Sequence, residues 1–130
     1  MKGFVCGVCG YIGIDGEAPA QCPICGAKKA AFTAEENAVK EAVDEKNLTE
    51  PEKKHIPVIT VMKRCGLITH GCVDVHVKIG EVQHPMLPEH YITNIDIHLN
   101  RKFLSGVTLS PDANPAASFH IKAEAGNIQV

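Results

Sequence analysis

The stretch "VDVHVKI", residues 73–79, alternates apolar and polar side chains without a break. Successive side chains of an extended strand point to opposite faces, so this alternation predicts one buried face and one solvent-facing one. The apolar face carries Val73, Val75, Val77 and Ile79. The polar face carries Asp74, His76 and Lys78. The segment therefore predicts a strand of an antiparallel sheet that covers a hydrophobic core.

Runs of similar composition surround this strand: "IPVITVM" (56–62), "YITNIDIHL" (91–99), "FLSGVTLS" (103–110) and "ASFHIKAEA" (117–125). Alternation in two of them sets apolar residues against polar ones: Ile95, Ile97 and Leu99 against Asp96 and His98, and Phe119, Ile121 and Ala123 against His120, Lys122 and Glu124. Several short strands with one apolar face each predict a mainly β fold, a small antiparallel β-sandwich. The histidines on the polar faces are predicted to be surface residues: His76, His98 and His120.

The segment before the sandwich is charged and alanine-rich. Thr33 and Glu36 have the spacing of a capping box, which predicts a helix over residues 34–45. Its apolar face consists only of small side chains, Ala34, Ala38 and Ala42, so the helix is interpreted as a spacer. The chain is thereby divided into a cysteine-rich domain (1–32), a charged linker (33–51) and the sandwich (52–130).

Four cysteines stand at metal-ligand spacing in the first domain. Cys6 and Cys9 form one C-x2-C pair, and Cys22 and Cys25 form a second after twelve intervening residues. A glycine follows each pair, where the backbone must turn without a Cβ. Two such knuckles facing each other predict a tetrahedral sulfur cage, which suits zinc or a single iron ion.

Bulk properties exclude several classes of function. The formal net charge of −2 argues against nucleic acid as a partner. No apolar run approaches a membrane span, and the N-terminus lacks the apolar region of a secretory signal, so a cytoplasmic location is predicted. Six cysteines in such a chain are expected to act as metal ligands or redox groups. No hydrolase triad or phosphate-binding loop is present.

The stretch "QHPMLPEHY", residues 83–91, holds His84 and His90 six residues apart with two prolines between them. Pro85 and Pro88 exclude a helix and stiffen the loop. The two imidazoles are therefore presented in a nearly fixed relation, as a pair of metal ligands requires.

The cysteine pattern, with Tyr11 after the first pair and Pro23 inside the second, resembles rubredoxin, and its short spacer is similar to that of the rubredoxin-type domain of rubrerythrins. The resemblance covers about residues 3–32. It implies one iron held by Cys6, Cys9, Cys22 and Cys25, which carries an electron but has no open position for a substrate. Zinc is the alternative at this site.

The segments "KKHIPVI", "VHVKIGEVQHPMLPEHYI" and "AASFHI" resemble the iron domain of desulfoferrodoxins and neelaredoxins, the superoxide reductases. The resemblance covers about residues 52–130 and implies an immunoglobulin-like sandwich. It implies an iron bound by four histidines and one axial cysteine, where superoxide is reduced to hydrogen peroxide. His55, His84 and His90 match the first three histidines. Lys54 matches a lysine that attracts the anion to the open position.

The sequence departs from this pattern in three places. Lys53 stands where the family often has a glutamate, and Glu52 is one residue out of register. The segment "RCGLITHGC" adds Cys65, His70 and Cys72. The sequence also ends at "AGNIQV", about where a Cys-Asn-x-His element would supply the axial cysteine and the fourth histidine, so a defective or empty second site is expected.

Three interpretations of the added cysteines stay open: reduced thiols, a reversible disulfide, or a substitute axial ligand for the iron. At the level of function, the resemblance implies superoxide as substrate, a rubredoxin or an NAD(P)H-linked reductase as electron donor, and a homodimer. The alternatives are a non-catalytic electron carrier that uses only the four-cysteine iron, and a zinc-stabilised binding module.

Overall fold

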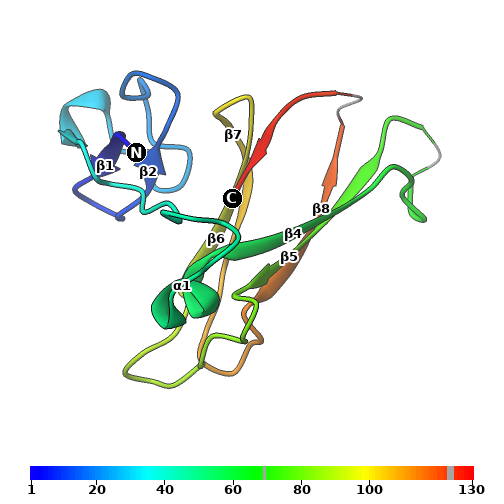
Figure 1. Ribbon diagram of the computed structural model, residues 1–130. Helices are drawn as coiled ribbons and strands as arrows, with labels where there is room; N and C mark the ends of the chain where they lie inside the picture. The colour runs from blue at the N-terminus through cyan, green and yellow to red at the C-terminus, as the bar shows by residue number, and fades with distance from the viewer. Residues whose placement is uncertain (69, 123–124) are drawn as a thin grey trace.

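The structure is a computed structural model that describes residues 1–68, 70–122 and 125–130. Within these ranges it is mainly β, with three three-stranded antiparallel sheets and one short α-helix (Figure 1). One sheet belongs to the cysteine-rich N-terminal unit, and the other two form the sandwich. None of the helices in these ranges has the length and apolar character that a bilayer crossing requires.

The N-terminal sheet has the strand order β2-β1-β3, with β1 at Gly3–Cys6, β2 at Ile12–Gly13 and β3 at Phe32–Glu35. A 3-10 turn at Lys29–Ala31 leads into β3. The strands are short because the two cysteine knuckles take up most of the chain between them.

The predicted helix over residues 34–45 is wrong. Residues 32–35 pair with β1 instead, and no helix is present between residues 36 and 49. Three alanines bury too little apolar area to hold a helix against a core, whereas pairing with β1 satisfies the backbone of residues 32–35. The Glu36 carboxylate forms an exposed ion pair with Lys2 at 3.3 Å instead of closing a capping box.

Helix α1, Glu50–His55, begins at a complete capping box formed by different residues. The Thr49 backbone N–H donates to Glu52 at 2.7 Å, and the Thr49 hydroxyl accepts from the Glu52 backbone N–H at 3.4 Å. Pro51 in the first turn is preset for helical geometry. The helix is a single short segment whose last turn carries Lys54 and His55.

The sandwich consists of two sheets with the strand orders β4-β5-β8 and β7-β6-β9. Their bounds are Pro57–Met62 (β4), Val73–Ile79 (β5), Asn94–Leu99 (β6), Lys102–Thr108 (β7), Ala116–Ile121 (β8) and Ile128–Gln129 (β9). The inward faces meet in one buried cluster: Val75, Val77, Ile79, Ile95, Ile97, Phe119 and Ile121. The predicted fold class and the alternation in β5 are therefore confirmed. Ala123 and Glu124, also placed by that alternation, lie outside the described residues.

His98 is buried, so its prediction as a surface residue is wrong. The register between β6 and β7 shifts between Ile97 and His98, which is a β-bulge. A bulge interrupts strict alternation, and as a result both residues face inward, with 0% and 6% of their surface exposed. His76, on the polar face of β5, is exposed as predicted and lies 2.8 Å from the Ser118 hydroxyl.

The N-terminal unit contacts the sandwich at the turn between β6 and β7. The Tyr11 hydroxyl lies 3.2 Å from Nε2 of His98, and the Tyr11 ring meets Phe103 edge-on at 5.6 Å. Arg101 Nε donates to the Ile14 carbonyl at 2.8 Å. Burial lowers the pKa of His98, so its neutral ring can accept a hydrogen bond from the Tyr11 hydroxyl. A buried aromatic contact with a polar tie therefore holds the two units together.

This contact predicts a pH dependence of stability. Burial raises the pKa of Tyr11 to about 12 from an ordinary value of 10.0. Unfolding therefore becomes easier as pH rises above 10, because only the unfolded chain ionises there, and the loss levels off near pH 12. We expect this loss to reach about 2 kcal/mol in guanidinium unfolding curves. Tyr11→Phe should flatten the alkaline limb, whereas Tyr91→Phe, away from the interface, should leave it intact. An unchanged limb in Tyr11→Phe would contradict the assignment.

Candidate metal centres

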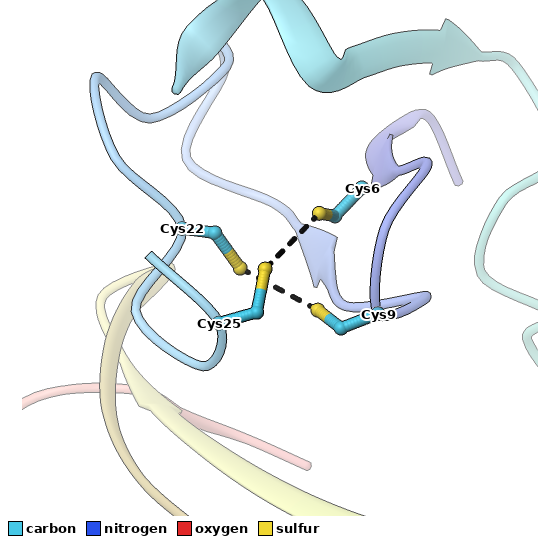
Figure 2. A group of neighbouring side chains, drawn as sticks. All are labelled: Cys6, Cys9, Cys22 and Cys25. Atoms are coloured by element: carbon cyan, nitrogen blue, oxygen red, sulfur yellow. Dashed lines mark hydrogen bonds between the residues drawn. The ribbon is translucent and has the colours of Figure 1, made fainter. Parts of the chain in front are cut away.

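The four predicted cysteines converge at one point (Figure 2). The Sγ atoms of Cys6 and Cys25 are 3.7 Å apart, and those of Cys9 and Cys22 are 3.6 Å apart. A tetrahedral ion with metal–sulfur bonds of about 2.3 Å has sulfur–sulfur edges of about 3.8 Å. The sulfurs are thus already at the spacing that iron or zinc requires, and the donor set fits either ion.

The backbone of each knuckle prepares the thiolates. Gly10 N–H donates to the Cys6 carbonyl at 2.9 Å, and Gly26 N–H to the Cys22 carbonyl at 3.0 Å. Both glycines have a positive φ, 80° and 79°, which any residue with a Cβ adopts at a cost. A hydrogen bond from the Cys9 backbone amide lowers the pKa of Cys6 to about 7. Burial raises the pKa of Cys9 to about 12, so of these two thiols Cys6 ionises first and presents the thiolate that binds a metal.

Exposure divides the four cysteines into two pairs. Cys6 and Cys22 are buried and pack with Tyr11, while Cys9 and Cys25 face solvent. A metal held here is enclosed on one side and lies close to the surface on the other. Four protein ligands leave no open position, so the centre cannot bind a substrate, and only with iron could it exchange electrons with a partner.

The three predicted histidines also converge. Nitrogen atoms of His55, His84 and His90 all lie within 4.8 Å of one another. The ring centroid of His84 is 4.8 Å from that of His55 and 4.7 Å from that of His90, whereas His55 and His90 are 6.3 Å apart. The distance between the His55 and His90 rings exceeds the other two distances by about a third. In an equilateral triangle the three distances would be equal, whereas in a square the diagonal exceeds the side by about two fifths, so the arrangement is closer to a square. The three imidazoles thus lie at three corners of an approximate square, and His84 occupies the corner between the other two.

Backbone carbonyls orient two of these rings. Nδ1 of His55 donates to the Pro51 carbonyl at 2.6 Å, and Nδ1 of His84 donates to the Pro85 carbonyl at 2.7 Å. Nε2 of each ring is left with a free electron pair for a metal. Burial lowers the pKa of His84, and the nearby charges of His55, His90 and Lys54 lower it further. His84 is therefore held in the neutral form that binds a metal.

Tight backbone contacts bring α1 against the histidine loop. Gly80 N–H donates to the Ile56 carbonyl at 3.2 Å, and Val82 N–H donates to the Lys53 carbonyl at 3.0 Å. Within the loop, Leu87 and His90 exchange two backbone hydrogen bonds of 3.0 and 3.1 Å around a proline-containing turn. These contacts place His55 and His90, which lie far apart in sequence, beside the buried His84.

Gly80→Ala should disrupt the histidine site without touching a ligand. Gly80 has a φ of +86°, and a Cβ there would meet the Val82 carbonyl oxygen as well as those of Lys53 and Lys54 at 2.8 Å. Helix α1 must then move away, which separates His55 from His84. We expect at least tenfold weaker metal binding at the histidines and unchanged four-cysteine absorption. Gly66→Ala, where a Cβ meets nothing within 4 Å, is the control. Equal affinity in both variants would contradict this role.

The departures at the family's glutamate position have a structural explanation. Glu52 is occupied by the α1 capping box, where hydrogen bonds from the Thr49 backbone and side chain lower its pKa. Lys53 forms an ion pair with Glu50 at 2.8 Å. Neither side chain serves as a ligand to the histidine cluster, whose members are His55, His84 and His90.

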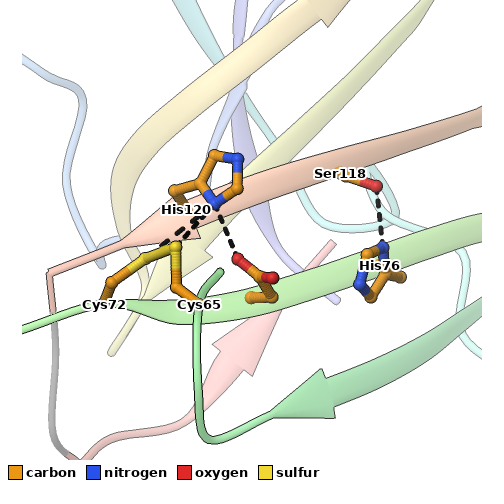
Figure 3. Close-up of polar contacts among 6 residues, drawn as sticks. Cys65, Cys72, His76, Ser118 and His120 are labelled. Carbon is orange, nitrogen blue, oxygen red and sulfur yellow. Dashed lines mark hydrogen bonds and ion pairs between the residues drawn. A yellow bond between two sulfur atoms is a disulfide. The ribbon is translucent and has the colours of Figure 1, made fainter. Parts of the chain in front are cut away.

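A third cluster, which sequence reasoning missed, lies at the other end of β5 (Figure 3). Cys65 and Cys72 form a disulfide, which selects one of the three interpretations left open. His120 Nδ1 lies 2.6 Å from Asp74, its cross-strand partner, and 3.2 Å from the Cys65 sulfur. The only signal in the sequence is that Asp74 and His120 occupy polar faces; their register is not encoded locally. The axial-ligand alternative is wrong, because β5 separates this cluster from the histidine loop by about 20 Å.

Comparisons with known proteins assign the chain to a family. The family model described as desulfoferrodoxin matches residues 47–130, and that described as the rubredoxin-like domain of rubrerythrin matches residues 4–33. A desulfoferrodoxin of Clostridium acetobutylicum is 36% identical over 69 residues, 53% of this chain and 47% of that protein. The chain thus spans about half the length of this curated relative. The crystal structure of the superoxide reductase from Treponema pallidum is 28% identical, with a TM-score of 0.48 over 92% of this chain and 78% of that one. The chain belongs to the desulfoferrodoxin family and carries a rubredoxin-like domain at its N-terminal end.

Proposed function

We propose that this chain is an oxidoreductase of the superoxide reductase type. It takes superoxide, one electron and two protons to hydrogen peroxide at an iron held by His55, His84 and His90, and it transfers electrons through the four-cysteine centre. The observation that carries the proposal is the placement of three imidazoles at three corners of an approximate square, two of them with Nδ1 donating to a backbone carbonyl. Membership of the desulfoferrodoxin family supports it.

Bound iron would supply the single electron and a position at which the anion can approach. The chain's own groups do the rest. The hydrogen bonds at Nδ1 leave Nε2 of His55 and His84 free to bind the iron, and burial keeps His84 uncharged. His55 and His90 are exposed, so both protons can come from solvent at this surface. We expect three imidazoles alone to hold iron more weakly than four thiolates, so the defective second site expected from the sequence would be one of low occupancy, and the reaction is proposed for the molecules in which this site carries iron.

Lys54 is proposed to attract superoxide. Its charge lies near enough to His84 to contribute to the lowered pKa of that ring, after burial and the two other histidines. Lys54→Met should reduce the rate constant for oxidation of the ferrous histidine centre about tenfold at low salt and weaken its dependence on ionic strength. Lys63→Met, at the far end of the sandwich, is the matched control. Stopped-flow mixing with superoxide measures both, and an unchanged salt dependence in Lys54→Met would exclude the steering role.

The same measurement tests the function itself. Reduced, iron-loaded protein should yield hydrogen peroxide in proportion to superoxide added, and the histidine centre should oxidise before the four-cysteine centre. If only the four-cysteine absorption changes and no peroxide forms beyond spontaneous dismutation, the protein is an electron carrier. A colourless protein containing zinc would instead support a binding module.

The proposal extends to partners and location. The electrons would come from a rubredoxin or from an NAD(P)H-linked reductase, entering at the exposed Cys9 and Cys25. A homodimer is supported by the edge strand β4, whose side chains Val58, Val61 and Met62 are between 40% and 52% exposed. We place the protein in the cytoplasm, in the defence against oxidative stress.

A further inference from the structure

The cluster at the start of β5 has the composition of a metal site as well as of a disulfide. Two sulfurs, a carboxylate and an imidazole offer ligand atoms that all lie within 4.8 Å of one another: those of Cys65, Cys72, Asp74 and His120. The sulfurs lie 3.2 and 3.9 Å from His120 Nδ1. A tetrahedral zinc ion with bonds of about 2.0 to 2.3 Å requires donor separations of about 3.3 to 3.8 Å. The two separations between sulfur and nitrogen are thus near the required spacing, whereas reduction must part the two bonded sulfurs and Asp74 must move away from Nδ1, from which it lies 2.6 Å.

The sandwich itself assembles these donors. Cys72 immediately precedes β5 and Asp74 is its second residue, so the two lie close together at the start of this strand. The β5–β8 register sets His120 directly opposite Asp74. Cys65 enters from the segment after β4, and its Cα lies 5.3 Å from that of Cys72. A loop that already brings the thiols together needs only small movements to exchange a bond between sulfurs for bonds to a metal.

The charge of the surroundings fits the same ion. Two thiolates and one carboxylate around a divalent cation leave one negative charge. Lys63 and Arg64 precede Cys65 directly, and the Lys122 side chain lies against Gly71. The donor atoms are partly accessible, with 38% of the His120 side chain and 17% of the Asp74 side chain exposed. An ion or a small oxidant can therefore reach the sulfurs.

We infer that Cys65, Cys72, Asp74 and His120 form a redox-controlled zinc site: the reduced thiols bind a divalent thiophilic cation of the zinc type, and disulfide formation releases it. This site is separated from the histidine cluster by the length of β5, so the inference does not depend on the reaction proposed there.

The two states interconvert by balanced chemistry. A dithiol reduces the disulfide, becomes a cyclic disulfide itself and leaves two thiols on the protein. Zinc then displaces both thiol protons into solvent, and the ring proton of His120 moves from Nδ1 to Nε2, so that the neutral ring binds through Nδ1. In the reverse direction, hydrogen peroxide oxidises the two sulfurs: the S–S bond forms, the O–O bond breaks, and two waters leave after uptake of two protons. Zinc departs, the ring proton of His120 moves back from Nε2 to Nδ1, and Nδ1–H again donates to Asp74, the contact present in the disulfide form.

Zinc itself is the probe. The 130-residue protein with iron in the four-cysteine centre is reduced with a dithiol, freed of reductant under nitrogen, loaded with zinc chloride and desalted. Metal content is measured by mass spectrometry of the elements. We expect reduced wild type to retain one equivalent of zinc more than Cys65→Ser/Cys72→Ser. Stoichiometric hydrogen peroxide should release that equivalent from wild type as the disulfide forms, and none from the variant.

Two histidine variants separate a four-donor site from a simple dithiol. His120→Ala should bind the extra zinc at least tenfold more weakly in a chelator competition. His76→Ala, an exposed histidine on the same sheet, should bind it as wild type does. Iron absorption and circular dichroism establish that each variant is folded. Equal zinc content in reduced wild type and the double serine variant, full affinity in His120→Ala, or retention of zinc after disulfide formation would each overturn the inference.

Discussion

Replacing Cys22 by serine is expected to strip the metal from the N-terminal centre and to unfold the unit around it. The Cys22 residue is only 3% exposed, and it forms the buried cluster of this unit together with Cys6 and Tyr11. Such a small core depends on its metal, and binding of a structural ion at thiolates contributes on the order of 10 kcal/mol to folding. The Cys22 side chain thus serves both as a metal ligand and as part of the hydrophobic core.

The measurement combines iron content, thiolate-to-iron absorption in the visible range and nuclear magnetic resonance of the residues before the linker. Cys22→Ser should lose all three signals of an ordered centre, while the sandwich keeps its strands. Cys65→Ser, which removes a cysteine outside the centre, should keep the colour. A Cys22→Ser protein with full iron content and wild-type absorption would refute the predicted cage.

Replacing His84 by alanine should have the second largest effect, the loss of metal from the histidine cluster. His84 occupies the middle corner, with its ring centroid within 4.8 Å of both other rings, and only 2% of its surface is exposed. Without it, His55 and His90 are left 6.3 Å apart between ring centroids and cannot form a three-nitrogen site. We expect at least a hundredfold weaker binding of ferrous iron there, because a direct ligand contributes more than the tenfold to hundredfold of a second-shell partner.

Anaerobic titration with ferrous iron, on protein whose four-cysteine centre is already filled, gives the affinity directly. His76→Ala is the matched control, since it removes an exposed imidazole from β5, the strand that leads into the histidine loop. Thermal unfolding of both variants distinguishes lost ligation from lost folding. Tight binding of a second iron by His84→Ala would show that the histidines do not form the site.

Sequence patterns among neighbouring residues were sufficient to predict most of the fold. The alternation of Val75, Val77 and Ile79 identified the core face of β5, and their burial confirms it. The C-x2-C spacing identified a sulfur cage because each knuckle is closed by hydrogen bonds within four residues of the chain. In such cases sequence distance and spatial distance are nearly the same.

The errors arose where a distant partner competed with a local pattern. Thr33 and Glu36 had the spacing of a capping box, but pairing with β1 left residues 32–35 extended. His98 had the position of an outward residue, but the bulge next to Ile97 turned it toward Tyr11 of the other unit. Neither β1 nor Tyr11 is adjacent in sequence, so no window of neighbouring residues contains this information.

The candidate sites also divide into those that local motifs predict and those that depend on contacts between residues distant in sequence. Resemblance of short motifs sufficed to group His55, His84 and His90, since the proline-bounded loop carries two of them. The Asp74–His120 pair depends on strand register, which is set by the whole sandwich. For this reason the cluster with Cys65 and Cys72 emerged only in three dimensions.

The backbone ties of the histidine rings bear on how this protein can evolve. His55 and His84 are oriented by the carbonyl oxygens of Pro51 and Pro85, and every amino acid has such an oxygen. A side-chain partner would be lost by a single substitution, whereas these two survive any replacement that preserves the path of the main chain. Substitutions around the site can therefore accumulate while the orientation of the imidazoles stays the same. Selection then acts on positions such as Gly80, where the course of the main chain depends on the residue type.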